Sequence, residues 1–173
     1  MKLTASAVNS AALFVGIDPG AHGAIAFYDP TTDALDVHDM PTHQVKIAGK
    51  NKTRIDMYGL GVLIDCRRNA IRTATIELVT SSPQMGVASA FAFGEAYGAA
   101  RMAVAANIVP SNLVRPQEWK AHFRLIGKDK DASRAKASTL LPNHAKHWQL
   151  KKHDGRAEAA LLALYGEYLS RSR

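Results

Sequence analysis

Apolar residues fall into short continuous runs in the first two thirds of the chain and recur at helical spacing between and after those runs. The first two runs, 13–18 and 24–28, flank a Pro-Gly turn, which is typical of paired β-strands. The first run ends on Asp18, so a carboxylate stands at the lip of the predicted sheet, and Gly20 and Gly23 leave room beside it. Five runs predict strands at 13–18, 24–28, 35–40 and 74–79, and a short fifth strand that begins at 107–109.

Helical spacing between and after these runs completes the predicted fold. Helices are expected at 55–72, at 87–105, from Pro116, from a cap at Asp131 to 141, and at 155–170. This order predicts an α/β domain with a central mixed five-stranded sheet flanked by helices. The polar segment 41–54, which carries four lysines and arginines, is expected to form a mobile basic loop. No repeat or linker divides 13–170, and 1–12 is expected to be a flexible tail.

Composition narrows the class of protein without identifying it. A chain of 173 residues that is 47% hydrophobic suits one globular domain with a real core. A net charge of +7 favours a polyanionic partner, although a merely basic surface has the same charge. One cysteine excludes a disulfide framework and a cysteine-based zinc cluster. No apolar run approaches the ~20 residues that cross a membrane, so a cytoplasmic protein is expected.

Four acidic residues form the candidate chemistry. Asp18 ends a strand, Glu77 interrupts another, and Asp154 and Glu158 share one face of the last helix. A carboxylate cluster prefers hard cations such as Mg²⁺ or Mn²⁺, and two such ions can activate water and stabilise a leaving oxygen in phosphodiester cleavage. Each residue also has a structural interpretation, as a turn former, a surface strand residue, a helix cap, or a solvated residue paired with Arg156 or Lys152. The sequence pattern alone does not show that the four converge.

Several motifs in order resemble those of the RuvC-type Holliday-junction resolvases, in particular their phage- and prophage-encoded branch. They are GIDPGxxGA, IE at a strand, SSPQMGVASAFAFGEAYGAA, VRPQEWKAHF, GKDKDASRA and HDGRAEAALLA, and they span about 13–165 with a variable region at 41–73. The resemblance implies an RNase H-like fold, a homodimer, and symmetrical Mg²⁺-dependent cleavage of four-way DNA junctions.

By motif position, the resemblance implies metal-binding carboxylates at Asp18, Glu77, Asp154 and Glu158, with two Mg²⁺ ions per site. The last two acidic residues are four apart here and three apart in better-known members, so His153 is an alternative third ligand. The carboxylate of Asp154 is the harder ligand and is preferred. The aromatic residue that can wedge into the junction has no match, because Gln84 and Met85 occupy its loop.

Basic residues around these motifs are candidates for binding DNA phosphates or for stabilising charge near the scissile phosphate. In the family's arrangement they are Lys120, Lys128, Lys130, Arg134 and Lys136. Lys128 and Lys130 are preferred because they lie in a turn, and Lys128 is the candidate catalytic lysine. For any one of them, a solvated surface position is the alternative.

The sequence therefore predicts a magnesium-dependent, homodimeric endonuclease that resolves four-way junctions by paired nicks, with no membrane segment. A flap- or fork-specific nuclease on the same fold and a non-catalytic protein that binds branched DNA are the alternatives. An actin-type ATPase also begins with a strand ending in Asp-Gly. It needs a second phosphate-binding half for which 173 residues leave no room, so no nucleotide cofactor is expected.

Overall fold

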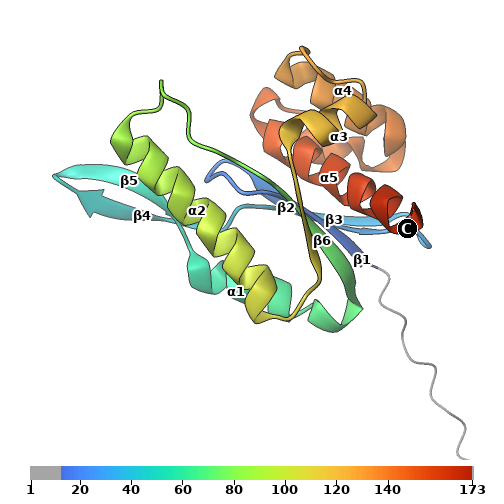
Figure 1. Cartoon of the computed structure of the whole chain (residues 1–173), viewed down its shortest axis with the longest axis horizontal. Helices are drawn as coiled ribbons and strands as arrows, with labels where there is room; N and C mark the ends of the chain where they lie inside the picture. Colours follow the sequence, from blue (N-terminus) through green and yellow to red (C-terminus); the bar gives the residue numbers. More distant parts are fainter. Residues whose placement is uncertain (1–12, 173) are drawn as a thin grey trace, which may run out of the picture.

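The computed structural model describes residues 13–172, with the backbone alone described at Lys130, so the tail expected at 1–12 lies outside the described residues. A mixed five-stranded sheet in the order β3-β2-β1-β6-β7 forms the centre (Figure 1). Its strands are β1 (Leu13–Asp18), β2 (Ala24–Asp29), β3 (Ala34–Asp39), β6 (Ile71–Glu77) and β7 (Ser111–Val114). β1 to β3 form the antiparallel meander, whereas β6 and β7 run parallel to β1. The predicted sheet is confirmed.

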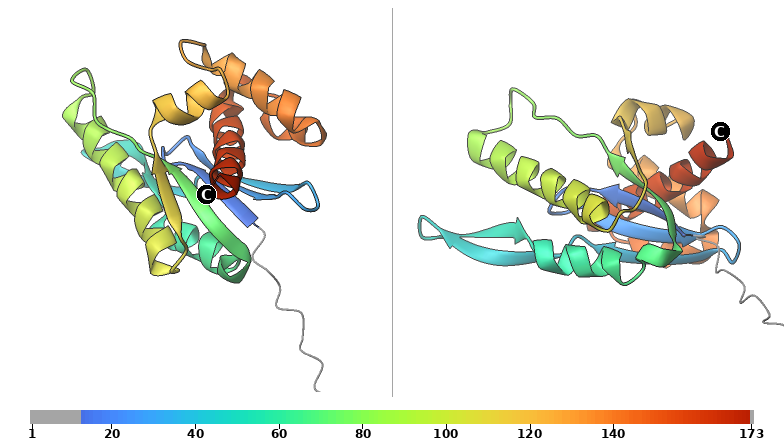
Figure 2. Two further views of the ribbon diagram at one scale, coloured as in Figure 1. Left: turned by 45° about the vertical axis from the view of Figure 1, so that its right-hand side comes forward. Right: turned by 60° about the horizontal axis from the view of Figure 1, so that its bottom comes forward.

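Helices cover both faces of this sheet (Figure 2). They are α1 (Met57–Asp65), α2 (Val87–Ala106), α3 (Pro116–His122), α4 (Lys130–Leu140) and α5 (Asp154–Arg171). One core joins α1 and α2 to the sheet through Val15, Ile17 and Phe27, and the other packs α5 against Ala24 and Ala26 on the opposite face. The strand residues alternate between the two cores, as a sheet buried on both faces requires.

The segment expected to be a basic loop at 41–54 is an antiparallel hairpin instead. Its strands are β4 (Thr42–Ile47) and β5 (Lys50–Ile55), which form a separate two-stranded sheet. Ala48 and Gly49 connect them with φ angles of 48° and 76°, the left-handed pair that a two-residue type I′ hairpin turn requires. At the other end, the Asp56 N–H donates to the Pro41 carbonyl at 2.9 Å and closes the base. Mobility of this segment stays a prediction.

Other differences concern element ends. The strand predicted from 107–109 corresponds to β7. It begins only at Ser111, because the chain turns at Ile108 with a left-handed φ of 55°. Asp129, not Asp131, caps α4 by accepting a hydrogen bond from the Ala132 N–H at 3.0 Å. Within residues 13–172, none of the helices has the length and apolar character needed to cross a bilayer.

Candidate active site

Asp18 occupies the end of β1, where the chain turns sharply into β2. Its Oδ1 lies 3.5 Å from the Gly20 backbone nitrogen, which donates to it, and Gly23 packs directly against its side chain. A Cβ at Gly23 would lie 2.9 Å from the Asp18 Cγ, so any larger residue there would displace the carboxylate. The Gly20 position has ordinary space, and its contribution is the backbone donor.

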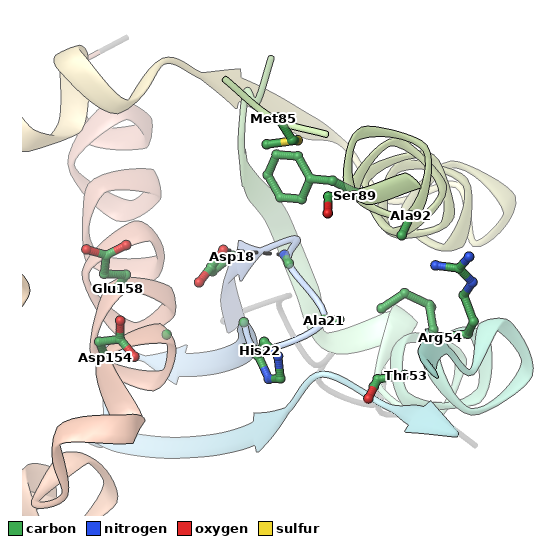
Figure 3. Close-up of a pocket in the computed structure, with 15 residues that line it drawn as sticks. Asp18, Ala21, His22, Thr53, Arg54, Met85, Ser89, Ala92, Asp154 and Glu158 are labelled. Carbon is green, nitrogen blue, oxygen red and sulfur yellow. Dashed lines mark hydrogen bonds between the residues drawn. The ribbon is translucent and has the colours of Figure 1, made fainter. Parts of the chain in front are cut away.

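The topology brings the other three candidate carboxylates toward Asp18. Glu77 ends β6, which runs parallel beside β1, so the carboxyl ends of both strands meet at one sheet edge. Asp154 and Glu158 lie on the first turns of α5, which packs across β1 and β2. Gly155 permits this approach, since a Cβ there would lie 3.1 Å from the Asp18 Oδ2. Figure 3 shows Asp154 and Glu158 on α5 facing Asp18.

The acidic groups around Asp18 affect the pKa of its carboxyl. Burial raises its pKa to about 7, and the charges of Glu77, Glu158 and Asp154 add to that rise. Burial also raises the pKa of Glu77, with the negative charge of Glu158 as a further cause. Accumulated negative charge at a sheet edge is costly unless a cation or a proton offsets it.

Side chains of the protein donate hydrogen bonds to Glu77 and Glu158. The fully buried Trp119 donates its indole N–H to the Glu77 Oε1 at 2.9 Å, and this bond opposes the rise in the pKa of Glu77. The buried Ser133 donates its hydroxyl to the Glu158 Oε1 at 3.0 Å. The Lys120 Nζ lies 3.6 Å from the same Glu158 oxygen and 5.0 Å from the Trp119 ring centroid. The two glutamates are therefore oriented rather than free to rotate.

The donor set fits a hard divalent cation. All four side chains offer carboxylate oxygens, the ligands that Mg²⁺ and Mn²⁺ prefer, and their mutual repulsion would be relieved by a cation among them. In the arrangement of residues 13–172, no three histidine, cysteine, aspartate or glutamate side chains are already grouped closely enough to hold a metal ion. Glu77 and Glu158 instead satisfy the protein donors described above.

Three of the four carboxylates open onto a cavity of about 460 Å³, and Glu77 is not among the residues that line it (Figure 3). Asp18, Asp154 and Glu158 line it from the sheet edge and α5, and Arg54 of β5 and Phe93 of α2 line it from the other side. Arg54 also forms an ion pair with Glu95 of α2, with its Nε 3.5 Å from the Glu95 Oε2. The cavity therefore has an acidic wall on α5 and a wall formed by the hairpin and α2.

The two candidates for the third acidic position lie in different surroundings. Asp154 lines the cavity and raises the pKa of Asp18. His153 is absent from the residues that line this cavity, and burial together with the charges of Arg156 and Lys152 lowers the pKa of its imidazole. The choice of ligand stays a prediction, with Asp154 the better placed.

The candidate basic residues are spread over α3, α4 and the turn between them. Lys120 alone among those with described side chains contacts the carboxylate set, whereas Lys128 is exposed in the turn and Lys136 is half-buried on α4. Arg134 is engaged within the protein, with its Nη2 2.7 Å from the Asp131 Oδ1. The side chain of Lys130 lies outside the described residues.

The loop between β6 and α2 places its two candidate residues differently. Met85 lines the cavity, while Gln84 is exposed and its amide oxygen accepts a hydrogen bond from Ser82. Sequence reasoning missed Ser133, whose small hydroxyl carries no periodic signal. It also gave no sign that the Trp119 indole contacts Glu77.

Comparison with known proteins connects this geometry to a fold. No family model and no curated protein sequence matches the chain. Among solved structures, Thermus thermophilus RuvC superposes with a TM-score of 0.57 at 18% identity, over 92% of this chain and 96% of that one. Thermus thermophilus RuvC in complex with a Holliday junction substrate superposes with a TM-score of 0.55 at 17% identity, over the same shares. The chain therefore has the RuvC fold, an RNase H-like arrangement.

Proposed function

We propose that this protein is a magnesium-dependent DNA endonuclease that resolves four-way junctions by paired, symmetrical nicks. The observation that carries the proposal is the Asp18 carboxylate, held at the edge of a RuvC-type sheet with three further carboxylates acting on it. A solved structure of this fold contains a Holliday junction substrate, and the net charge of +7 suits a polyanionic ligand.

Asp18, Glu77, Asp154 and Glu158 would hold two Mg²⁺ ions, and Mn²⁺ would substitute. When bound, such ions supply the charge that activates a water molecule and stabilises the departing 3′-oxygen. The chain's own residues do the positioning. Trp119 and Ser133 fix the directions of Glu77 and Glu158, and the ammonium of Lys120 offsets negative charge beside Glu158.

Symmetrical nicking needs two sites related by a two-fold axis, so the proposal includes a homodimer. The outer face of α2 supports this, because Val87, Phe91 and Met102 are 88%, 72% and 63% exposed and share one side of the helix. Gly94 and Gly98 lie between them with open space around their α-carbons, which permits close approach of a second helix. A second copy would cover this apolar face.

The test is cleavage of a synthetic four-way junction, with duplex, flap and fork substrates as controls. Wild type and Asp18→Asn are compared in Mg²⁺ and in chelator. Paired Mg²⁺-dependent nicks that disappear in the variant, while junction binding persists, would support the proposal. Cleavage confined to flaps or forks would overturn the substrate, and tight binding without cleavage in any divalent metal would overturn the enzyme activity.

A further inference from the structure

The β4–β5 hairpin is the most basic exposed feature that the carboxylate site does not use. Its strands and turn carry three lysines, an arginine and a histidine and no acidic residue. Eight of the twelve strand residues are exposed, and Figures 1 and 2 show the hairpin projecting from the main sheet beside the N-terminal half of α2. A hairpin that projects alone buries too little to be stable by itself, so its base must be anchored.

The base of the hairpin is anchored beside the cavity that Asp18, Asp154 and Glu158 line, which forms the cleft of the candidate active site. Ile55 is buried in the core beneath α2, and Arg54 pairs with Glu95 of that helix while lining the cavity that holds Asp18. Figure 3 shows Arg54 and Thr53 across the cavity from the carboxylates on α5. The direction of the hairpin is therefore fixed relative to the candidate active site.

The strand register places several of the basic residues in one row on the same face of the hairpin. Alternate residues of a strand point to the same face, so Lys50 and Lys52 lie on the face of Arg54, spaced by about 7 Å. His43 pairs with Arg54 and lies on this face too, while Lys46 lies on the other. The row begins at the cavity wall and leads outward to the turn.

Composition separates the possible partners. Protein–protein interfaces are depleted in lysine and centre on apolar and aromatic residues, whereas the exposed part of this hairpin has no aromatic residue and only Val45, Ile47 and the small Ala48 as apolar residues. Contacts to nucleic-acid backbones rely on lysine and arginine together with polar side chains. The hairpin offers such polar side chains at Gln44, Asn51 and Thr53, on the face of Lys46. The lysines could instead only guard exposed strand edges against aggregation.

We infer that the β4–β5 hairpin is a DNA-binding arm, whose Lys50 and Lys52 contact backbone phosphates of the duplex that leaves the cleft past Arg54. This inference rests on the proposed DNA substrate and assigns a second contact surface to it, across the cleft from α3 and α4. Because the lysines lie outward from the carboxylates, the arm supplies affinity without entering the chemical step.

The test is binding of the double variant Lys50→Gln/Lys52→Gln in the Asp18→Asn background. The matched control is Arg72→Gln/Arg171→Gln, which removes the same charge at the start of β6 and the end of α5, away from Glu77 and Asp154. Binding to a four-way junction and to a duplex of the same sequence is measured from 50 to 300 mM salt. We expect affinity about tenfold weaker than the control, with a log–log salt slope smaller by about 2 for the two phosphates lost.

The cleavage readout separates this inference from the proposed function. With Asp18 intact and protein in saturating excess, the hairpin variant should cut as fast as the control. Affinity and salt slope equal to those of the control would overturn the DNA-binding arm, and aggregation of the variant with unchanged DNA binding would assign the lysines to edge protection. If wild type cuts no substrate but the lysine-dependent duplex binding persists, the arm stands and the nuclease proposal fails.

Discussion

Asp18 and Asp39 occupy equivalent places in the sheet and have opposite electrostatic environments. Both end a strand, and both pair with Ala24 of β2, so they flank it in one row at the same sheet edge. Asp39 receives two hydrogen bonds from the Arg156 guanidinium, both at 2.6 Å, and these lower the pKa of its carboxyl. Asp18 is surrounded by other acids, and its pKa rises to about 7.

The difference distinguishes a structural carboxylate from one prepared for a ligand. A paired aspartate at a strand end fastens α5 to β3, and Arg156 extends the link to the His147 carbonyl at 3.2 Å. The three carboxylates near Asp18 form no such ion pair with it. Their repulsion and the burial of Asp18 destabilise its charged form in the folded chain. Such a cost is offset when a cation binds, which agrees with the metal-binding role that we propose for Asp18.

The largest expected difference between substitutions of Asp18 and Asp39 is in cleavage activity. Asp18→Asn should reduce junction cleavage in Mg²⁺ by about a thousandfold or more, because it removes a carboxylate from the set that would hold the metal, a contribution of several kcal/mol. Asp39→Asn should stay within about fivefold of wild type, because an exposed ion pair is worth ~1 kcal/mol or less. Single-turnover cleavage measures both. Comparable losses in the two variants would contradict the distinction.

Without metal, the two substitutions should change the free energy of unfolding in opposite directions. In chelator at pH 8, Asp18→Asn should raise the free energy of unfolding by about 2 kcal/mol, since it removes a charge that burial and its neighbours disfavour. Asp39→Asn should lower it by about 0.5 kcal/mol. Urea unfolding followed by circular dichroism gives both values.

Added Mg²⁺ supplies the control for that result. At ten times its dissociation constant, a ligand of the folded state stabilises wild type by about 1.4 kcal/mol. The same addition should stabilise Asp39→Asn equally and leave Asp18→Asn nearly unchanged. An equal response of Asp18→Asn and wild type would place the ion elsewhere.

The pH dependence follows from the same two pKa directions. Between its ordinary value of 3.8 and about 7, the folded chain keeps a proton on Asp18 that the unfolded chain has released. Stability therefore falls as pH rises through this window, and the stabilisation by Asp18→Asn in chelator should be about 1 kcal/mol smaller at pH 5 than at pH 8. Asp39 contributes the reverse: its stabilisation is present above 3.8 and is lost as pH falls through its lower folded pKa. A pH-independent effect of Asp18→Asn would contradict the raised pKa.

The sequence predicted the parts of the molecule that repeat a local pattern. The strand ending in Asp18 is an apolar run, and the spacing of Asp154 and Glu158 placed them together on α5. The strand that carries Glu77 was predicted at 74–79, whereas β6 spans Ile71–Glu77 and ends at this glutamate. The hairpin was missed because Val45 and Ile47 are the only apolar residues of β4 and Ile55 is the only one of β5, and because their Ala48–Gly49 turn lacks the usual Asn-Gly or Asp-Gly signal. Lysine-rich strands without apolar alternation resemble loops in sequence.

The hydrogen-bond partners of the carboxylates could not be predicted in the same way. Trp119 lies 42 residues from Glu77, and a buried tryptophan has the same sequence pattern whether its N–H reaches a carboxylate or a hydroxyl. Trp148 illustrates this, since it is equally buried and donates to the Ser138 hydroxyl at 2.9 Å. Only the tertiary packing decides which partner each indole meets.

These two tryptophans give the smallest and most selective test. Trp119→Phe keeps most of the ring packing and removes the donor that holds Glu77, so the pKa of Glu77 should rise further and its direction should loosen. Cleavage should fall about three- to tenfold, in line with ~1 kcal/mol for a lost hydrogen bond. Trp148→Phe should cost similar stability and leave cleavage unchanged, because Ser138 touches no carboxylate of the site. If Trp148→Phe reduces cleavage as much as Trp119→Phe does, the Trp119 indole acts only through packing. The orientation of Glu77 would then be set by its strand and not by this hydrogen bond.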